Sequence, residues 1–230
     1  MLFRSGGGGG GGDFITGLWS ARTTSSSGNA ATANQIIDDG EGNSYVVGTY
    51  TDVLTVRNAS DSTSSTFGSS GSDSILIKYT SSGDVAWAAR AGGTDFEYGL
   101  GVAASSSGNV YVTGTFSSGD FTVYDSLDIP FSNTLSCTGA TDIFIAKYDY
   151  SGAIKWIAQI GGSGTDTVTK IVIDSSENLY ISGYYSSDPI SFYNSDQGSA
   201  ADTQNRVGSY DGFVAKYSSD GVYQWSATCG

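Results

Sequence analysis

The amino-acid sequence predicts an all-β fold of β-propeller type, built from tandem four- to five-stranded antiparallel blades, about three repeats plus a partial one. Two observations predict it. The chain repeats itself with a period near 69 residues, and each repeat is a string of short apolar stretches between polar turns. No window has the sustained 3.6-residue apolar period of an amphipathic helix, so we expect almost no helix.

Three motifs recur in the same phase. The four tryptophans, each followed two residues later by alanine, stand 68, 69 and 69 residues apart at Trp19, Trp87, Trp156 and Trp225. A stretch that begins with aspartate and ends in Lys-Tyr occupies 73–79, 142–148 and 211–217. A stretch that begins Asn-x-Tyr occupies 43–48, 109–114 and 178–183. Composition alone does not align three registers, so the chain is a repeat protein.

Each element of the repeat has a local signal. The aspartate-headed stretch is apolar on both faces, as in a fully buried strand, and the tryptophan strand carries its apolar residues at period two. Glycine and serine mark the turns, and a weaker apolar stretch ends the unit. In the best-defined copy we expect strands at 143–148, 154–158, 170–174, 179–183 and 190–193.

The repeats divide the chain into five parts. The expected divisions are a flexible glycine-rich leader at 1–12, repeat 1 without its first strand at 13–72, repeat 2 at 73–141, repeat 3 at 142–210 and a partial repeat 4 at 211–230. Closed propellers have about 4–8 blades. We therefore expect a fold that depends on neighbours: strand exchange between two copies, an open stack that other subunits cover, or a piece of a longer protein.

The stretch from Trp156 to Asp166 and its continuation from Ile171 to Gly183 resemble the SBBP type of β-propeller repeat, as does the Asp-x-Phe-Ile-Ala-Lys-Tyr strand. The resemblance covers about residues 13–230. It implies a propeller-type fold without a defining catalytic residue. Such repeats occur in secreted or surface proteins of bacteria and in large DNA viruses, so the resemblance implies a virion, cell-surface or extracellular setting.

Composition excludes several function classes. The formal net charge is −13, which argues against binding to nucleic-acid phosphates or anionic membrane surfaces. The chain has no histidine, which removes histidine-dependent catalysis and histidine metal ligation. It shows no classical signal peptide and no apolar run of about 20 residues that would insert into a membrane.

The recurring aromatic residues are predicted to form the core. Each tryptophan lies beside a small alanine on one face of its strand, which favours packing between blades over stacking on sugars. We assign the same structural role to the tyrosines that end the aspartate-headed strand: Tyr79, Tyr148 and Tyr217.

The recurring aspartates Asp73, Asp142 and Asp211 have two interpretations. We expect them to accept backbone N–H bonds where a connector enters a strand, because no copy has a second acid in its own strand. Calcium ligation or acid catalysis is the alternative. The lysines Lys78, Lys147 and Lys216 are expected to pair with carboxylates on adjacent strands. The acidic cluster at 38–43 is interpreted as a hairpin turn rather than a calcium loop.

The remaining candidates concern modification and contact. Cys137 and Cys229 either form a disulfide, within the chain or between chains, or stay as free thiols. Asn58 heads the single N-x-S/T sequon, a candidate glycosylation site. The connectors vary most between copies, so a partner surface is expected there, with candidate anchors Phe131, Leu135 and Arg206.

These observations favour a non-enzymatic structural or interaction protein, an acidic and rigid scaffold in a larger assembly such as a minor capsid, fibre or surface component of a virion. Its expected partners are other protein subunits or copies of itself. No cofactor or metal is indicated. A secreted or surface adhesin that binds glycans is the alternative, and a propeller glycosidase is a further one, although no pair of facing carboxylates stands out.

Overall fold

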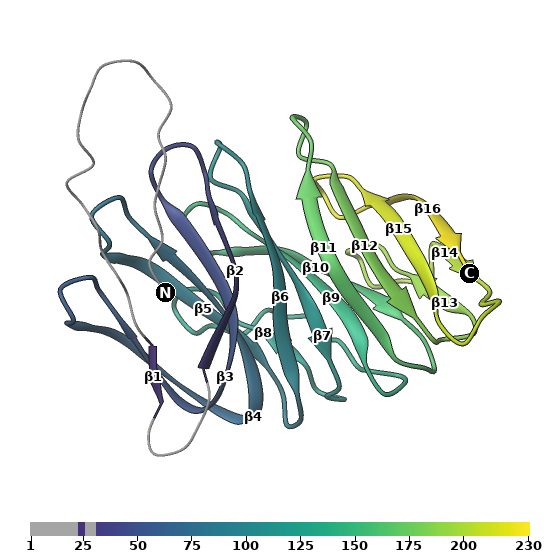
Figure 1. The fold of residues 1–230 in the computed structure, drawn as a ribbon, viewed down its shortest axis with the longest axis horizontal. Helices are drawn as coiled ribbons and strands as arrows, with labels where there is room; N and C mark the ends of the chain where they lie inside the picture. Colours follow the sequence, from purple (N-terminus) through teal and green to yellow (C-terminus); the bar gives the residue numbers. More distant parts are fainter. Residues whose placement is uncertain (1–22, 26–30) are drawn as a thin grey trace.

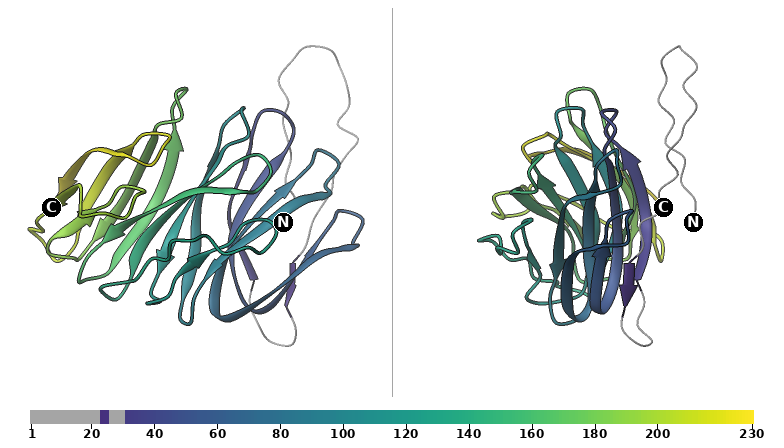
Figure 2. Two further views of the ribbon diagram at one scale, coloured as in Figure 1. Left: turned by 180° about the vertical axis from the view of Figure 1, so that it is seen from behind. Right: turned by 90° about the vertical axis from the view of Figure 1, so that its left-hand side faces the viewer.

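The computed structural model describes residues 23–25 and 31–230, and in this part of the chain all regular structure is β-strand (Figure 1). The described part holds no helix that could span a membrane. The strands form three antiparallel sheets, and the all-β prediction is confirmed. The sheets lie side by side along the long axis of the molecule without closing into a ring (Figure 2).

Each sheet has four main strands. Sheet 1 contains β2 (Ala31–Asp38), β3 (Ser44–Arg57), β4 (Thr63–Tyr79) and β5 (Val85–Gly92). Sheet 2 contains β6 (Glu97–Ala104), β7 (Val110–Phe116), β9 (Asp142–Tyr148) and β10 (Ile154–Gly161). Sheet 3 contains β11 (Asp166–Ile173), β12 (Leu179–Tyr185), β15 (Asp211–Tyr217) and β16 (Tyr223–Cys229).

The sheets have the period of the sequence repeat but a different phase. The sequence units begin at the aspartate-headed strand, whereas sheets 2 and 3 begin two strands later, at β6 and β11, directly after the tryptophan strands β5 and β10. Each sheet therefore combines the end of one sequence unit with the start of the next. A periodic sequence determines the spacing of equivalent residues, and the hydrogen-bonded pairing of strands decides where one sheet ends.

A fifth strand passes from sheet 2 to sheet 1 and from sheet 3 to sheet 2. β8 (Thr122–Val123) belongs to the connector of sheet 2 and pairs with β5 of sheet 1. β13 (Ile190–Phe192) belongs to the connector of sheet 3, pairs with β10 of sheet 2, and continues the hairpin to β14 (Asp202–Gln204). The weak fifth stretch of the repeat thus covers the outer edge of the preceding sheet, an edge that would otherwise be open to pairing.

The core lies between the sheets. We call the face of a sheet that carries its tryptophan the front face and the opposite one the back face. The front face of sheet 2, with Tyr111, Ile145 and Ala158, packs against the back face of sheet 3, with Ile181 and Ala215. Burial of each isoleucine side chain stabilises the fold by roughly 1.5–3 kcal/mol, and burial of each alanine stabilises it by less. The front face of sheet 1 packs in the same way against the back face of sheet 2.

Candidate functional site

Buried carboxylates form one candidate site, at the edge where the connectors enter the sheets. Asp73, Asp142 and Asp211 are almost fully buried. Each faces a glycine at the end of a tryptophan strand: a Cβ atom on Gly161 would lie 2.3 Å from Cγ of Asp142. The glycine is required there because a side chain would occupy the space of the carboxylate.

Asp142 and Asp211 hold backbone amides. The carboxylate of Asp142 accepts hydrogen bonds from the N–H groups of Thr138 and Gly162, at 3.1 and 3.2 Å. Asp211 accepts from the N–H groups of Val207 and Gly208, at 2.7 and 2.8 Å. These contacts are those expected of an aspartate that organises the end of a connector.

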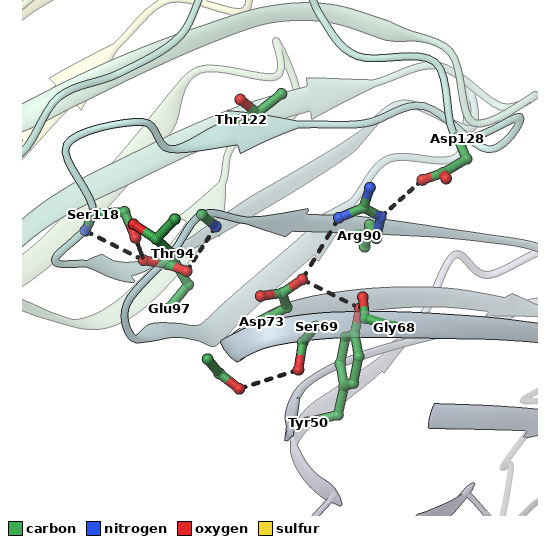
Figure 3. Close-up of polar contacts among 12 residues, drawn as sticks. Tyr50, Gly68, Ser69, Asp73, Arg90, Thr94, Glu97, Ser118, Thr122 and Asp128 are labelled. Carbon is green, nitrogen blue, oxygen red and sulfur yellow. Dashed lines mark hydrogen bonds and ion pairs between the residues drawn. The ribbon is translucent and has the colours of Figure 1, made fainter. Parts of the chain in front are cut away.

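Asp73 has side-chain partners instead. Its Oδ2 atom accepts from the hydroxyl of Tyr50 at 3.4 Å and lies 3.6 Å from a guanidinium nitrogen of Arg90 (Figure 3). Arg90 also reaches Asp128 at 2.8 Å and lies over the ring of Tyr124, with Cζ 3.6 Å from the ring centroid. In sheet 2 the position of Arg90 is Gln159, which donates to Asp142 at 2.6 Å.

Two further acids, which the sequence interpretation missed, join these aspartates from the first strand of a neighbouring sheet. Glu97 accepts from the N–H of Gly93 at 2.9 Å and from the hydroxyl of Ser118 at 2.5 Å (Figure 3). Its counterpart Asp166 accepts from the N–H and the hydroxyl of Ser187. The available signal was their separation of 69 residues, the period of the repeat.

Burial controls the ionisation of these groups. Burial raises the pKa of Asp73 to about 7, and the charge of Glu97 adds to the rise while Arg90 opposes it. Burial likewise raises the pKa of Asp142 to about 6. It also raises the pKa of Glu97 and of Asp166. Pairs of perturbed acids can serve in catalysis. These carboxyls are enclosed and bonded to donors of their own chain, which is an arrangement for holding connectors.

The acidic cluster at 38–43 is the hairpin turn between β2 and β3. Asp39 accepts from the N–H groups of Glu41 and Asn43 at 2.9 and 3.1 Å. In the part of the chain that the structure describes, no group of three or more Cys, Asp or Glu side chains is arranged to hold a metal ion.

A second candidate site is the aromatic cluster on each front face. In sheet 1 the ammonium of Lys78 lies 5.3 Å from the ring centroid of Tyr45, and the ring centroids of Tyr45 and Trp87 are 6.0 Å apart. The Nε1–H group of Trp87 donates to the carbonyl of Tyr150 at 3.0 Å, and Lys78 Nζ donates to the same oxygen at 3.5 Å. Tyr150 lies in the β9–β10 turn, so the cluster joins sheet 1 to sheet 2.

Sheet 2 repeats the arrangement. Lys147 Nζ lies 5.2 Å from the ring centroid of Tyr111, which lies 6.1 Å from that of Trp156. Both Trp156 Nε1 and Lys147 Nζ donate to the carbonyl of Ser219, at 3.0 and 2.9 Å. Ser219 lies in the β15–β16 turn of sheet 3. The expectation that the repeated lysines pair with carboxylates was wrong for Lys78 and Lys147, because a tyrosine ring and a backbone carbonyl hold each of them.

Sheet 3 has the same cluster without a cover. Lys216 Nζ lies 5.0 Å from the ring centroid of Tyr180, which is 6.3 Å from that of Trp225. Trp156 is 8% exposed, whereas Trp225 is 43% exposed. The assignment of Trp225 to the core was wrong for this chain, because no further sheet packs on the front face of sheet 3 among the described residues. Trp19 lies outside the described residues.

The rest of that face is equally open. Val214 is 41% exposed and Tyr184 is 42% exposed, whereas the equivalent residues of sheet 2, Ile145 and Thr115, are 0% and 5% exposed. We define the open face as the front face of sheet 3. Its large apolar residues are Val172, Tyr184, Val214 and Trp225.

The other candidates are placed as follows. Tyr79, Tyr148 and Tyr217 are buried on the back faces. Cys137 and Cys229 are free thiols, so the chain has no internal disulfide between them, and a disulfide between chains stays a prediction. Asn58 is half-buried, and its side chain accepts from the N–H of Val85 at 2.8 Å and donates to Ser62 Oγ at 2.8 Å.

The connector anchors are only partly available. Leu135 was expected on a partner surface but is buried in the core between sheets 1 and 2, where Phe131 packs against the same cluster. The guanidinium of Arg206 donates to the carbonyls of Gly208 and Ser209 within its own connector. These connector side chains therefore stabilise the fold instead of forming a partner surface, because the connector hairpins cover the sheet edges.

Comparison with known proteins supports the repeat. Residues 155–189 match the family model described as SBBP, a β-propeller repeat, which confirms the resemblance for this copy. The chain is 34% identical over 142 residues to an uncharacterized WD repeat-containing protein, L264, of Acanthamoeba polyphaga mimivirus. It is 27% identical over 150 residues to the regulatory protein FlaEY of Caulobacter vibrioides. These matches cover 62% and 65% of this chain, and 10% and 14% of the respective relatives.

Proposed function

We propose that this chain of β-propeller repeats is a non-catalytic protein-interaction scaffold that joins neighbouring subunits through its open face. One observation carries the proposal: the face that is buried between sheets 1 and 2, and again between sheets 2 and 3, is uncovered on sheet 3. A contiguous apolar patch on a protein surface commonly marks an interaction site. The rigid sheets behind the patch hold it in a fixed shape.

The two relatives support a role in protein interaction. One is named for WD repeats and the other as a regulatory protein, and neither name states a reaction. The buried acids support the same role, because their hydrogen bonds go to their own connectors and stiffen the edges of the sheets.

Within this role we place the chain in a large assembly, as a virion component such as a minor capsid, fibre or surface protein. The 34% identity to a protein of a large virus supports this setting. The net charge of −13 keeps the exposed surface hydrophilic outside the apolar patch. A cell-surface or extracellular location is the alternative within the same proposal.

Glycan binding is a second candidate, favoured by aromatic rings on the surface. Tyr184 and Tyr210 form an exposed edge-to-face pair with ring centroids 5.7 Å apart, and Trp225 is exposed on the same sheet. Exposed aromatic rings can stack on sugar rings. A glycan array with the wild-type protein and Tyr184→Ala tests this: specific binding that the substitution abolishes would favour an adhesin over a structural scaffold.

The test of the scaffold function compares two charge insertions. Val214→Asp places a carboxylate in the centre of the open face, and Leu127→Asp places one on an exposed connector of sheet 2. Tagged variants are produced in the native host, and assemblies are separated by density-gradient sedimentation. We expect wild-type protein and Leu127→Asp to sediment with the assembly and Val214→Asp to remain at the top. Equal sedimentation of both variants would contradict the proposal.

A further inference from the structure

We propose that the open face binds sheet 1 of a second copy of this chain, head to tail and in both directions, so that two copies close into one ring of six sheets. The inference rests on the proposed scaffold function and names its partner. Six sheets lie within the 4–8 blades of closed propellers. The occupant is identified by the interfaces that already exist within one copy.

The open face has the geometry of the two covered faces. The Lys–Tyr and Tyr–Trp distances in sheet 3, 5.0 and 6.3 Å, match those of sheets 1 and 2 within a few tenths of an ångström. Lys216 and Trp225 are therefore already in the arrangement in which Lys147 and Trp156 bind the next sheet. A preorganised face loses little side-chain entropy when a partner docks.

The repeat identifies the acceptor that this cluster lacks. In both internal interfaces the lysine and the indole donate to the second residue of the turn before a tryptophan strand, Tyr150 or Ser219. The residue 69 positions before Tyr150, and thus the counterpart in sheet 1, is Ser81, which is exposed. Its turn is closed by the same backbone bond, from the N–H of Gly83 to the carbonyl of Thr80 at 2.9 Å.

The glycine of that turn has the shape that the indole requires. A Cβ atom on Gly152 would lie 3.0 Å from the ring of Trp87, and one on Gly221 would lie 2.8 Å from the ring of Trp156. These glycines have φ of 83° and 76°, and Gly83 has φ of 83°. The turn of sheet 1 therefore carries both features, the carbonyl and the glycine, that accept a tryptophan of the preceding sheet.

Sheet 1 already holds a strand in the position of the missing neighbour. β1 (Thr23–Ser25) pairs with the outer part of β3, with Thr23 opposite Val56. This pairing is equivalent to Ala91 opposite Val123 and to Ile160 opposite Phe192. In each pair the first residue follows its tryptophan by four positions, as Cys229 follows Trp225. The end of β16 from a second copy would therefore replace β1 against Val56.

The test begins with molar mass. Analytical ultracentrifugation of the full chain is run between about 0.1 and 50 µM for wild type, Trp225→Ala, Val214→Asp and Leu127→Asp. We expect wild type and Leu127→Asp to form a dimer and Val214→Asp to stay a monomer. For Trp225→Ala we expect the dissociation constant of the dimer to rise by roughly 30-fold or more. Wild-type protein that stays monomeric throughout, or Val214→Asp that dimerises like wild type, would overturn the inference. Circular dichroism of Val214→Asp is the check that the variant retains the fold.

Hydrogen exchange and thiol labelling then identify the two faces. On dimerisation we expect increased amide protection at 80–84, decreased protection at 23–25 where β1 leaves its edge, and at least tenfold slower alkylation of Cys229. A dimer without these changes at sheet 1 is joined front face to front face and refutes the head-to-tail arrangement. The failure of this inference can be distinguished from the failure of the proposed function. If the protein is monomeric but still enters an assembly through the open face, the scaffold function holds and only the second copy is excluded as the partner.

Discussion

Two tryptophans at the same position of the repeat provide a direct measure of what covering a sheet contributes. Trp156 and Trp225 have the same strand position and the same tyrosine and lysine neighbours. They differ in cover, with 8% and 43% of the residue exposed. Substitution of each by alanine therefore changes the same side chain in a covered and an uncovered setting.

The expected magnitudes follow from the buried area. A tryptophan buries about 200 Å², which at about 25 cal/mol per Å² corresponds to roughly 5 kcal/mol when burial is complete. Scaled by burial, Trp156→Ala should lower the free energy of unfolding by about 4–5 kcal/mol, including the loss of its hydrogen bond to Ser219. Trp225→Ala should lower it by about 2–3 kcal/mol, since almost half of its surface already contacts water.

Urea unfolding followed by far-ultraviolet circular dichroism measures both values. Both substitutions are made in the Val214→Asp background, so that self-association does not contribute. Trp87→Ala is the positive control, because the indole of Trp87 also bonds to the next sheet. Equal losses at Trp156 and Trp225, within about 0.5 kcal/mol and with unchanged denaturant dependence, would refute the view that the next sheet supplies the difference.

Two further predictions concern the buried carboxylates. The raised pKa of Asp73, about 7 against 3.8, means that the folded protein binds this proton more tightly than the unfolded chain, so the contribution of Asp73 to stability decreases as pH rises from about 4 to 7. In thermal unfolding, the free energy of unfolding should change by about 2 kcal/mol less between pH 5 and 8 in Asp73→Asn than in the wild type. An unchanged pH profile would count against the raised pKa of Asp73. Gly161→Ala should cost about 1–3 kcal/mol through its clash with Asp142, whereas Gly119→Ala, where a Cβ meets nothing closer than 3.9 Å, should cost under about 0.5 kcal/mol.

Much of the fold follows from local pattern. The period, the all-β class and the burial of Trp156 and Tyr148 were predictable, because alternation along a strand shows which side chains share a face. The backbone contacts of Asp142 were predictable for a different local reason, because an aspartate at the end of a connector commonly accepts nearby backbone N–H groups. Glu97 was not selected, because its neighbour Asp73 lies in another sheet and no spacing along one strand brings the two together.

The sequence by itself determined that the chain repeats, that its units are strands, and which residues are equivalent between units. Only the tertiary structure decided where each sheet begins, which edge each connector covers, and that Trp225 is exposed while Trp156 is buried. The physical reason is that equivalent residues have the same intrinsic preferences, whereas burial depends on the neighbour that packs against them. In a tandem array that neighbour differs at the ends.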